Sequence, residues 1–184
     1  TDQGSVDKDL SLVNTPTFSR SVPAEDATWN NRSLSFNGSD ERMTTTADDT
    51  LATKSYSFWA KSNVTGANGV FGHGDSTVGA FLFNNSVGKP LLYLGGSSYR
   101  YWVDNSSQDD DAWHHHVVYC EHDDMTNSKW YVDGVAQAAD NTVSTGSGDA
   151  YTSGLRVESV ASSYFDGELD EFAVFDGELT PAQV

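Results

Sequence analysis

The chain has 184 residues, with 27 Asp or Glu against 10 Lys or Arg, so its formal net charge is −17. A surface this acidic repels nucleic acid and anionic lipid, which excludes both as expected partners. The single cysteine, Cys120, excludes an intrachain disulfide, and no apolar run approaches the roughly 18 residues of a membrane span. The acidity suits sea water, brine or a calcium-containing extracellular fluid, so we expect an extracellular or surface-exposed location without membrane insertion.

Residues 1–30 are polar and carry few large apolar side chains. We expect them to form an N-terminal tail or the region of a first strand. No linker rich in Pro or Gly and no internal repeat divides the rest of the chain. The remaining residues, 31–184, are therefore expected to form one domain.

Beyond residue 33, short runs rich in aromatic and β-branched residues are separated by clusters of Gly, Asn, Asp and Ser. We expect strands over residues 34–36, 56–60, 70–71, 80–83, 91–94, 99–103, 115–119, 129–132, 155–157 and 168–175. This pattern predicts an all-β fold, a two-sheet antiparallel β-sandwich. Asp133 and Gly134 form a two-residue hairpin signal, because the glycine supplies positive φ. Near the end, Thr180 followed by Pro181 predicts an N-cap and one short C-terminal helical turn.

Four motifs stand in an order that is typical of a known family. They are Ser-Leu-Ser-Phe-Asn-Gly-Ser-Asp at 33–40, Tyr-Ser-Phe-Trp-Ala-Lys at 56–61, Trp-His-His-His at 113–116 with Tyr-Val-Asp-Gly at 131–134, and Tyr-Phe-Asp-Gly-Glu-Leu-Asp-Glu-Phe at 164–172. Together they resemble the LamG-like (laminin G-like) jelly roll of the concanavalin A-like lectin/glucanase superfamily, although Asn37 stands where that family often has Asp. The resemblance implies two packed antiparallel sheets, one of them curved. Members of the family include glycan-binding modules, adhesive and receptor-binding domains, calcium binders and virion appendage parts.

Retaining glucanases of this superfamily carry Glu-x-Asp-x-Glu or Glu-x-Asp-x-x-Glu on one strand, so that two carboxylates flank the glycosidic bond. Glu168 and Asp170 supply the first half of this pattern. The two positions where a second acid would stand hold Phe172 and Ala173. Without that acid nothing protonates the leaving oxygen or activates water, so we expect no glycosidase activity.

Asp170 needs hydrogen-bond donors or a cation if it points into the core. Strand alternation places it on the same face as Phe172 and Val174, and if that face is the core, an unpaired carboxylate there is costly. One interpretation is a carboxylate that accepts hydrogen bonds from turn amides. The other is structural calcium, a hard cation that takes carboxylate oxygens, with Asp166 and Asp40 as co-ligands. The resemblance to calcium-binding relatives adds weight to this second interpretation without fixing the ligands, and both interpretations stay open.

Three histidines follow Trp113, and two of them, His114 and His116, would share one face of a strand in a spacing that zinc sites use. The family resemblance instead implies that these rings pack and hydrogen-bond at the start of the strand. No clear third ligand lies nearby in the sequence, so we expect packing rather than a transition-metal site.

Exposed aromatic side chains are the useful sign of glycan binding, because sugar rings stack on Trp and Tyr. In each of two strands, alternation places an aromatic side chain on the face opposite to that of its apolar neighbours, which would be the outer face of a sheet. One of these side chains is a Trp and the other is a Tyr. A second group lies at the edge of a predicted loop and combines stacking with bidentate hydrogen-bonding groups. The candidate ligand-binding residues are therefore Trp59, Tyr131, Tyr99, Arg100, Tyr101 and Trp102. For each of them, packing in the interior is the alternative.

We therefore expect a non-catalytic recognition or adhesion module that binds a glycan or a surface receptor and holds structural calcium. The alternative is a structural assembly subunit, such as a virion decoration or appendage domain or an extracellular fibre unit, that binds neighbouring protein chains or forms a homo-oligomer. An exposed aromatic cluster would favour the first function, and large apolar interfaces would favour the second. The sequence shows no phosphate loop, dinucleotide fingerprint or nucleophile motif, so no organic cofactor is expected.

Overall fold

The computed structural model of the chain describes residues 11–24, 30–45, 53–73, 79–84, 89–95, 98–103, 108–121, 124–143, 155–157, 159–160 and 163–184. These residues form 17 strands and one short 3-10 helix, η1 (Met125–Asn127). None of the helical structure among them is long and apolar enough to cross a membrane.

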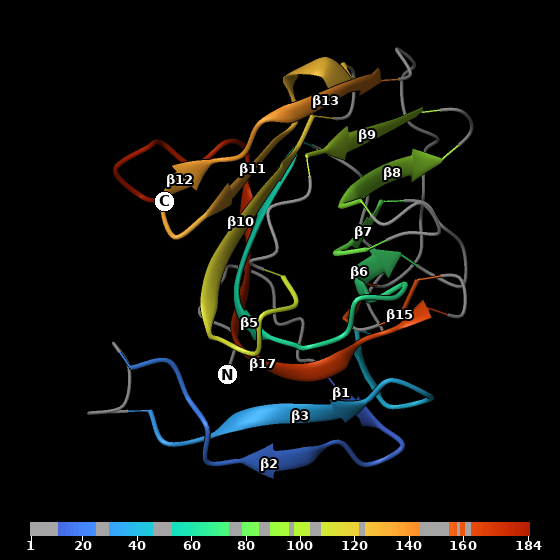
Figure 1. Ribbon diagram of the computed structural model, residues 1–184, viewed down its shortest axis with the longest axis vertical. Helices are drawn as coiled ribbons and strands as arrows, with labels where there is room; N and C mark the ends of the chain where they lie inside the picture. The colour runs from blue at the N-terminus through green and yellow to red at the C-terminus, as the bar shows by residue number, and fades with distance from the viewer. Residues whose placement is uncertain are drawn as a thin grey trace.

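Two antiparallel sheets carry almost all of these strands (Figure 1). The eight-stranded sheet contains, in spatial order, β1 (Ser11–Val13), β4 (Arg42–Thr44), β14 (Leu155–Val157), β6 (Gly69–His73), β7 (Ala80–Leu82), β8 (Leu91–Gly95), β9 (Ser98–Trp102) and β13 (Ala139–Val143). The seven-stranded sheet contains β12 (Val135–Ala136), β11 (Lys129–Val132), β10 (His114–Cys120), β5 (Lys54–Lys61), β17 (Asp166–Asp176), β3 (Ser33–Asn37) and β2 (Thr17–Ser19). A separate ribbon pairs β15 (Ser159–Val160) with β16 (Ser163–Tyr164). The predicted two-sheet antiparallel sandwich is confirmed: β5, β10 and β11 lie on one side of the molecule and β6 to β9 on the other.

The interior between the sheets is largely aromatic. Its largest fully buried side chains are Trp102, Trp130, Tyr56, Phe58, Phe71, Phe81, Phe83, Phe165, Leu92, Leu94, Met125 and His73. Strand alternation explains this pattern, because Phe58 and Ala60 of β5 are buried whereas Trp59 between them is only half-buried. Burying each large apolar side chain contributes roughly 1.5–3 kcal/mol, so this shared core holds the two sheets together.

Two short strands lie in the predicted N-terminal region. β1 pairs with β4, where Leu12 stands opposite Met43, and β2 pairs with β3, where Phe18 stands opposite Leu34. The segment thus gives one edge strand to each sheet, whereas the sequence indicated one strand at most. Each of these strands has three residues, which is too few for a hydrophobic period to be read.

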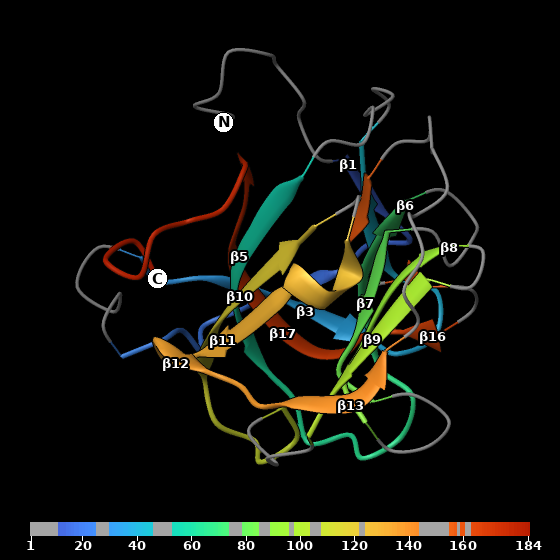
Figure 2. The same ribbon diagram turned by 90° about the horizontal axis from the view of Figure 1, so that it is seen from above.

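The predicted C-terminal helical turn is wrong. Residues 181–183 form a hydrogen-bonded turn in which the backbone N–H groups of Gln183 and Val184 donate to the carbonyl oxygen of Thr180. The N–H and hydroxyl of Thr180 both donate to Oε1 of Gln183, which closes the turn on itself. The helical turn that the described residues do contain is η1, before β11. Figures 1 and 2 both place the end of the chain beside β12.

The predicted hairpin at Asp133 and Gly134 is confirmed. Val132 pairs with Val135 across it, and the two turn residues have φ of 49° and 75°. Positive φ at both central positions is the conformation that matches the twist of a hairpin. Oδ1 of Asp133 also accepts a hydrogen bond from the backbone N–H of His115 at 2.9 Å, so the carboxylate ties the turn to β10.

Candidate functional site

The outer face of the seven-stranded sheet brings together several of the predicted residues. We call the half-buried group on this face the outer strip, which consists of Ser57, Trp59, His115, Tyr131 and Asp170. In the strand register, Trp59 of β5 stands between His115 of β10 and Asp170 of β17. The next row runs from Ser57 across β10 to Tyr131 of β11. All of them face away from the core because the residues that alternate with them face into it.

Neighbouring side chains hold the rings of the outer strip. Nε2 of His115 lies 2.8 Å from Oγ of Ser57, and the imidazole centroid lies 5.3 Å from that of Trp59 at an interplanar angle of 44°. The positions of Trp59 and Tyr131 are roughly 12 Å apart, given a strand spacing of about 4.8 Å and a rise of about 3.4 Å per residue. Such a surface can stack the apolar face of a sugar ring and hydrogen-bond its hydroxyls.

A β-bulge in β17 decides where its acids point. The register with β5 shifts between Asp170 and Ala173, and Glu171 adopts a φ of 47°. The extra residue reverses the alternation, so Phe172 packs in the core, 5.7 Å from Phe58, while Asp170 faces outward. The predicted common face of Asp170 and Phe172 is therefore wrong. A positive φ at a residue other than glycine costs roughly 1–2 kcal/mol, so the bulge is a strained position.

Two amide groups donate hydrogen bonds to the Asp170 carboxylate. Its Oδ2 accepts a hydrogen bond from the Asn30 side-chain amide at 2.8 Å, and its Oδ1 accepts one from the backbone N–H of Glu171 at 2.9 Å. These are the amide partners that the first of the two interpretations required. The two bonds fix the carboxylate next to Trp59, where its oxygens can also meet the hydroxyl of a ligand.

The outward positions of β17 resemble the glucanase pattern only in part. Beyond the bulge, Ala173 stands opposite Ser57, so the outward row reads Glu168, Asp170, Ala173. A methyl group therefore occupies the place of the last acid in the pattern. A shallow pocket of about 160 Å³ lies on this face and is lined by Glu168 and Lys61, among others. This row offers hydrogen-bond acceptors for hydroxyl groups.

The three acids predicted as calcium ligands do not meet at one point. Asp40 lies in the turn after β3, where Nδ2 of Asn37 donates to its Oδ1 at 3.0 Å and Nδ2 of Asn14 donates to its Oδ2 at 3.3 Å. Asp166 stands opposite Asn37, next to this turn, whereas Asp170 lies four residues further along the strand, roughly 13 Å away. Within the described ranges no group of three or more His, Cys, Asp or Glu is placed to hold a metal ion. One ion cannot be shared by all three acids, and calcium binding stays a prediction.

The predicted cluster on β9 is split between the two faces of the eight-stranded sheet. Tyr99 and Tyr101 point outward, with ring centroids 5.4 Å apart. Trp102 is fully buried, and the Arg100 guanidinium lies 5.8 Å from its ring centroid. Arg100 donates to carbonyl oxygens of η1, including that of Met125 at 3.1 Å, and burial lowers the pKa of its guanidinium. Arg100 and Trp102 therefore close the edge of the sandwich, and only the two tyrosines remain open to a ligand.

The histidines of β10 have different roles, and one of them belongs to the outer strip. His116 is fully buried; its ring stacks on Trp130, its Nδ1 accepts a hydrogen bond from Nε1 of Trp130 at 3.3 Å, and burial lowers its pKa well below the usual value. His114 lies between two carboxylates, with Nδ1 2.6 Å from Oδ2 of Asp133 and Nε2 3.2 Å from Oδ2 of Asp110. Burial opposes protonation of His114, but the bonds to both carboxylates outweigh it and raise its pKa. These two histidines do not form a shared ligand set for zinc.

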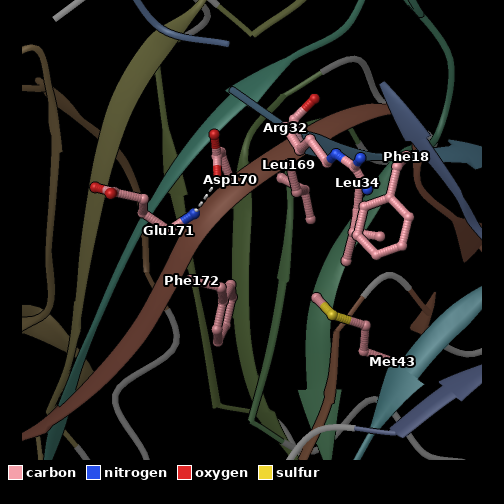
Figure 3. Close-up of a pocket in the computed structure, with 9 residues that line it drawn as sticks. Phe18, Arg32, Leu34, Met43, Leu169, Asp170, Glu171 and Phe172 are labelled. Atoms are coloured by element: carbon pink, nitrogen blue, oxygen red, sulfur yellow. Dashed lines mark hydrogen bonds between the residues drawn. The ribbon is translucent and has the colours of Figure 1, made fainter. Parts of the chain in front are cut away.

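A pocket of about 290 Å³ opens beside the bulge (Figure 3). It is lined by Phe18, Arg32, Ser33, Leu34, Met43, Leu169, Asp170, Glu171 and Phe172. β17 pairs with β3 only from Asp166 to Leu169, so the two strands part at the bulge and leave room for the pocket. The sequence did not predict this pocket, because Phe18 belongs to the expected N-terminal tail and a bulge cannot be recognised from a hydrophobic pattern.

Known proteins share this fold. Residues 36–184 match the protein-family model Laminin_G_3, described as concanavalin A-like lectin/glucanases superfamily. No curated protein shows significant similarity to the chain. Among solved structures, domain 4 of AbnA, a GH43 extracellular arabinanase from Geobacillus stearothermophilus, in complex with arabinotriose, has a TM-score of 0.59 and 14% sequence identity. That alignment covers 95% of this chain and 85% of the other.

Two toxin domains are similar as well. The binding domain of Paraclostridial Mosquitocidal Protein 1 has a TM-score of 0.66 at 10% identity, and the binding domain of botulinum neurotoxin DC in complex with SialylT has 0.64 at 10%. The alignments cover 95% and 96% of this chain but only 45% of each toxin chain. Identities this low show the fold alone. The family model, which matches most of the sequence, shows that the chain belongs to the concanavalin A-like lectin/glucanase superfamily.

Proposed function

We propose that the chain is a non-catalytic recognition module that binds a glycan, free or carried by a surface receptor, on the outer strip. The observation that carries this proposal is the row in which Trp59 stands between His115 and Asp170. An indole ring stacks against the C–H face of a sugar, while the imidazole and the carboxylate beside it offer a donor and acceptors for its hydroxyls. Tyr131 and Ser57 extend the same face by a second row.

The similar structures support a saccharide as the ligand class. One is described in complex with arabinotriose, another with SialylT, and a third as a neurotoxin whose cell entry depends on two ganglioside molecules. Electrostatics narrows the choice for this chain, because its net charge is −17 and Asp170 lies within the strip. Like charges repel, so we expect a neutral glycan to be preferred over a sialylated one. An extracellular place of action fits such a ligand.

The absence of catalysis is part of the proposal. It is supported by Ala173, which stands at the outward position where the glucanase pattern has its last acid. The similar structures are described as binding domains or as one domain of a larger enzyme, which agrees with a binding role. Structural calcium remains part of the proposal only at the turn after β3, which carries Asp40 and where Asp166 stands opposite Asn37.

A binding screen tests the proposal. The chain is applied to an array of neutral and sialylated oligosaccharides, and the tightest ligand is then titrated by calorimetry. Trp59→Ala should weaken its affinity about tenfold, which corresponds to the loss of roughly 1.4 kcal/mol of stacking and buried area. The matched control is Tyr99→Ala, on the outer face of the other sheet, which should leave the affinity unchanged. Binding that survives Trp59→Ala, or no binding to any neutral oligosaccharide, would contradict the proposal.

The competing function is that of a structural subunit that binds other protein chains. Exposed large apolar side chains are the observation in its favour, and they are Leu12, Phe18, Val103, Val135, Val174 and Phe175. Analytical ultracentrifugation separates the two functions. A monomer that binds a glycan supports recognition, whereas a stable homo-oligomer that binds no glycan supports assembly.

A further inference from the structure

We infer that β17 binds an extended segment of a partner protein along residues 172–175, which we call the open edge. The segment would add one strand to the seven-stranded sheet, with apolar side chains on the inner face and Lys or Arg side chains on the outer face. One apolar side chain would enter the pocket beside the bulge, whose apolar lining faces the inner side of the sheet. The outer strip lies on the opposite face, so this site is separate from the proposed glycan site and does not depend on it.

Beyond the bulge, β17 is paired on one side only. Its ladder with β5 continues from Ala173 to Asp176. Among the described residues, β3 is the strand on the other side, and its ladder with β17 ends at Leu169. The N–H of Gly177 donates to the carbonyl oxygen of Thr53 at 2.9 Å, which fixes which residues of the ladder with β5 are hydrogen-bonded to each other.

The backbone of the open edge can therefore be oriented residue by residue. In an antiparallel pair, residues alternate between exchanging hydrogen bonds with the partner strand and directing their N–H and C=O away from it. Counted back from Gly177, Ala173 and Phe175 bond to β5, and Val174 directs both backbone groups away from it. Within the described part of the chain no group bonds to the N–H of Val174 on that side. An unpaired edge of this kind is a template for another strand.

Apolar side chains are exposed on both faces of the open edge. Val174 faces inward, opposite Tyr56, and is 38% exposed. Phe175 faces outward, opposite Ser55, and is 42% exposed. An added strand would cover both side chains, and burying apolar area at an unpaired edge is the usual source of affinity in strand addition.

The pocket lies where the added strand would begin. Figure 3 shows Leu169 and Phe172 on the side of β17 that faces Met43, whereas Asp170 and Glu171 lie on its other side. A residue paired with Phe172 would point to the same inner face and reach the pocket. An apolar cavity of about 150 Å³ holds benzene, and this pocket has about 290 Å³, so a Leu or Phe side chain fits it.

Charge favours a basic segment over a second copy of this chain. Residues 166–178 carry six acidic side chains and no Lys or Arg, within a chain of net charge −17. Two such edges would repel each other, which argues against pairing of β17 with β17 of a second copy. On the outer face, a Lys or Arg of the added strand would lie beside the ring of Phe175, in position for a cation–π contact.

A set of peptides tests the inference. The probes are capped seven-residue peptides in which Val, Leu or Phe alternates with Lys, and a control set has Glu in place of Lys. Affinities are measured by fluorescence polarisation. We expect the best basic peptide to bind at least about tenfold more tightly than its acidic counterpart.

Two proline variants locate the binding edge. Val174→Pro removes an N–H that points away from β5 and keeps the ladder with β5, and it should weaken peptide binding about tenfold. Ala136→Pro is the matched control on β12, at the other edge of the same sheet. Its N–H also points away from its partner strand, because the N–H of Gln137 donates to the carbonyl oxygen of Trp130. This control should leave the affinity unchanged.

Measurements on the unchanged chain remain decisive if Val174→Pro does not fold. The amide proton of Val174 should exchange rapidly with water in the free chain and at least about tenfold more slowly with the best basic peptide bound. With methyl-¹³C methionine labelling, the same peptide should shift the signal of Met43, which lines the pocket, and leave that of Met125, which is fully buried beside η1, in place.

The opposite results are equally clear. No binding of any basic peptide at about 1 mM, equal binding of the basic and acidic sets, or an unprotected Val174 amide in the bound chain would each overturn the inference. A dimer of the chain that Val174→Pro dissociates would also overturn it, by placing a second copy on the open edge. None of these results changes the expected binding of a glycan at Trp59, so the proposed function stands or fails separately.

Discussion

Gly167 allows a sharp test of how β17 lies in the seven-stranded sheet. It has a φ of 151°, a backbone conformation that residues with a side chain rarely adopt. A Cβ atom at this position would lie 2.3 Å from the carbonyl oxygen of Lys61 and 3.0 Å from the ring of Phe165. Because the nearest atom belongs to the backbone, no side-chain rotation can relieve the clash in Gly167→Ala. β17 would have to move away from β5, which carries Trp59.

The expected loss of stability is large. Overpacking by one methyl group costs roughly 1–3 kcal/mol, and the unfavourable φ adds about 1–2 kcal/mol, so we expect Gly167→Ala to lose about 2–5 kcal/mol, with a midpoint of about 3.5 kcal/mol. For a chain of this size that corresponds to a melting temperature roughly 10 °C lower. The matched control is Gly134→Ala, at a φ of 75° with nothing within 4 Å of the added Cβ, which should lose only about 1 kcal/mol.

Thermal melts followed by circular dichroism, together with urea titrations, measure both variants. Equal losses in the two variants would refute the reasoning, because the clash with Lys61 would then contribute nothing. The close approach of β17 to β5, and with it the register that sets Asp170 opposite Trp59, would be in doubt.

Three further predictions concern protons and calcium. The carboxylates around His114 raise its pKa in the folded state, so they add stability that is fully present below the ordinary pKa of 6.5 and is lost as the pH rises through the raised value. His114→Asn should therefore lower the melting temperature at about pH 5.5 and change it little at about pH 8.5; a uniform loss would contradict this. Burial lowers the pKa of His116, so the unfolded chain binds the proton first and stability falls as the pH drops below 6.5. In His116→Phe, the free energy of unfolding, measured by denaturant titrations, should fall less steeply as the pH drops below 6.5. The same steepness as in the unchanged chain would count against this prediction. Calcium bound at the turn after β3 should raise the melting temperature of the chain but not that of Asp40→Asn. If adding a chelator at low salt leaves the melting temperature of the chain unchanged, calcium does not stabilise the fold.

The fold could be predicted because its strands have short, regular patterns. The run at 56–60 alternates strictly, and the structure buries its apolar members in β5. The hairpin at Asp133 and Gly134 depends on local turn chemistry alone, so a short stretch of sequence is enough to predict it. The four motifs in family order added the pairing of two sheets, which local patterns do not contain.

The candidate site could be predicted only in part. Trp59 and Tyr131 lie on the outer face that alternation indicated, and their role in binding stays a prediction. Asp170 lies on the face opposite to the one expected, because the bulge at Glu171 inserts one residue and reverses the alternation. The strained backbone at the bulge is stabilised by the contacts of the surrounding sheet, so the residues next to it in the sequence do not predict it.

The grouping of residues 99–102 failed for a simpler reason. Consecutive residues of a strand point to opposite faces, so Tyr99 and Arg100 could not act together. Tyr99 and Tyr101 face outward, whereas Arg100 covers Trp102 at the edge of the sandwich. The strand expected over residues 99–103 is present, and its alternation alone separates Arg100 and Trp102 from the two tyrosines.

The most direct test of the proposed glycan site is a crystal structure of the chain with its tightest array ligand. We expect one sugar ring in van der Waals contact with Trp59 and one sugar hydroxyl within hydrogen-bond distance of the Asp170 carboxylate. A sugar bound against Tyr99 and Tyr101 on the opposite sheet, with Trp59 left uncovered, would contradict the account.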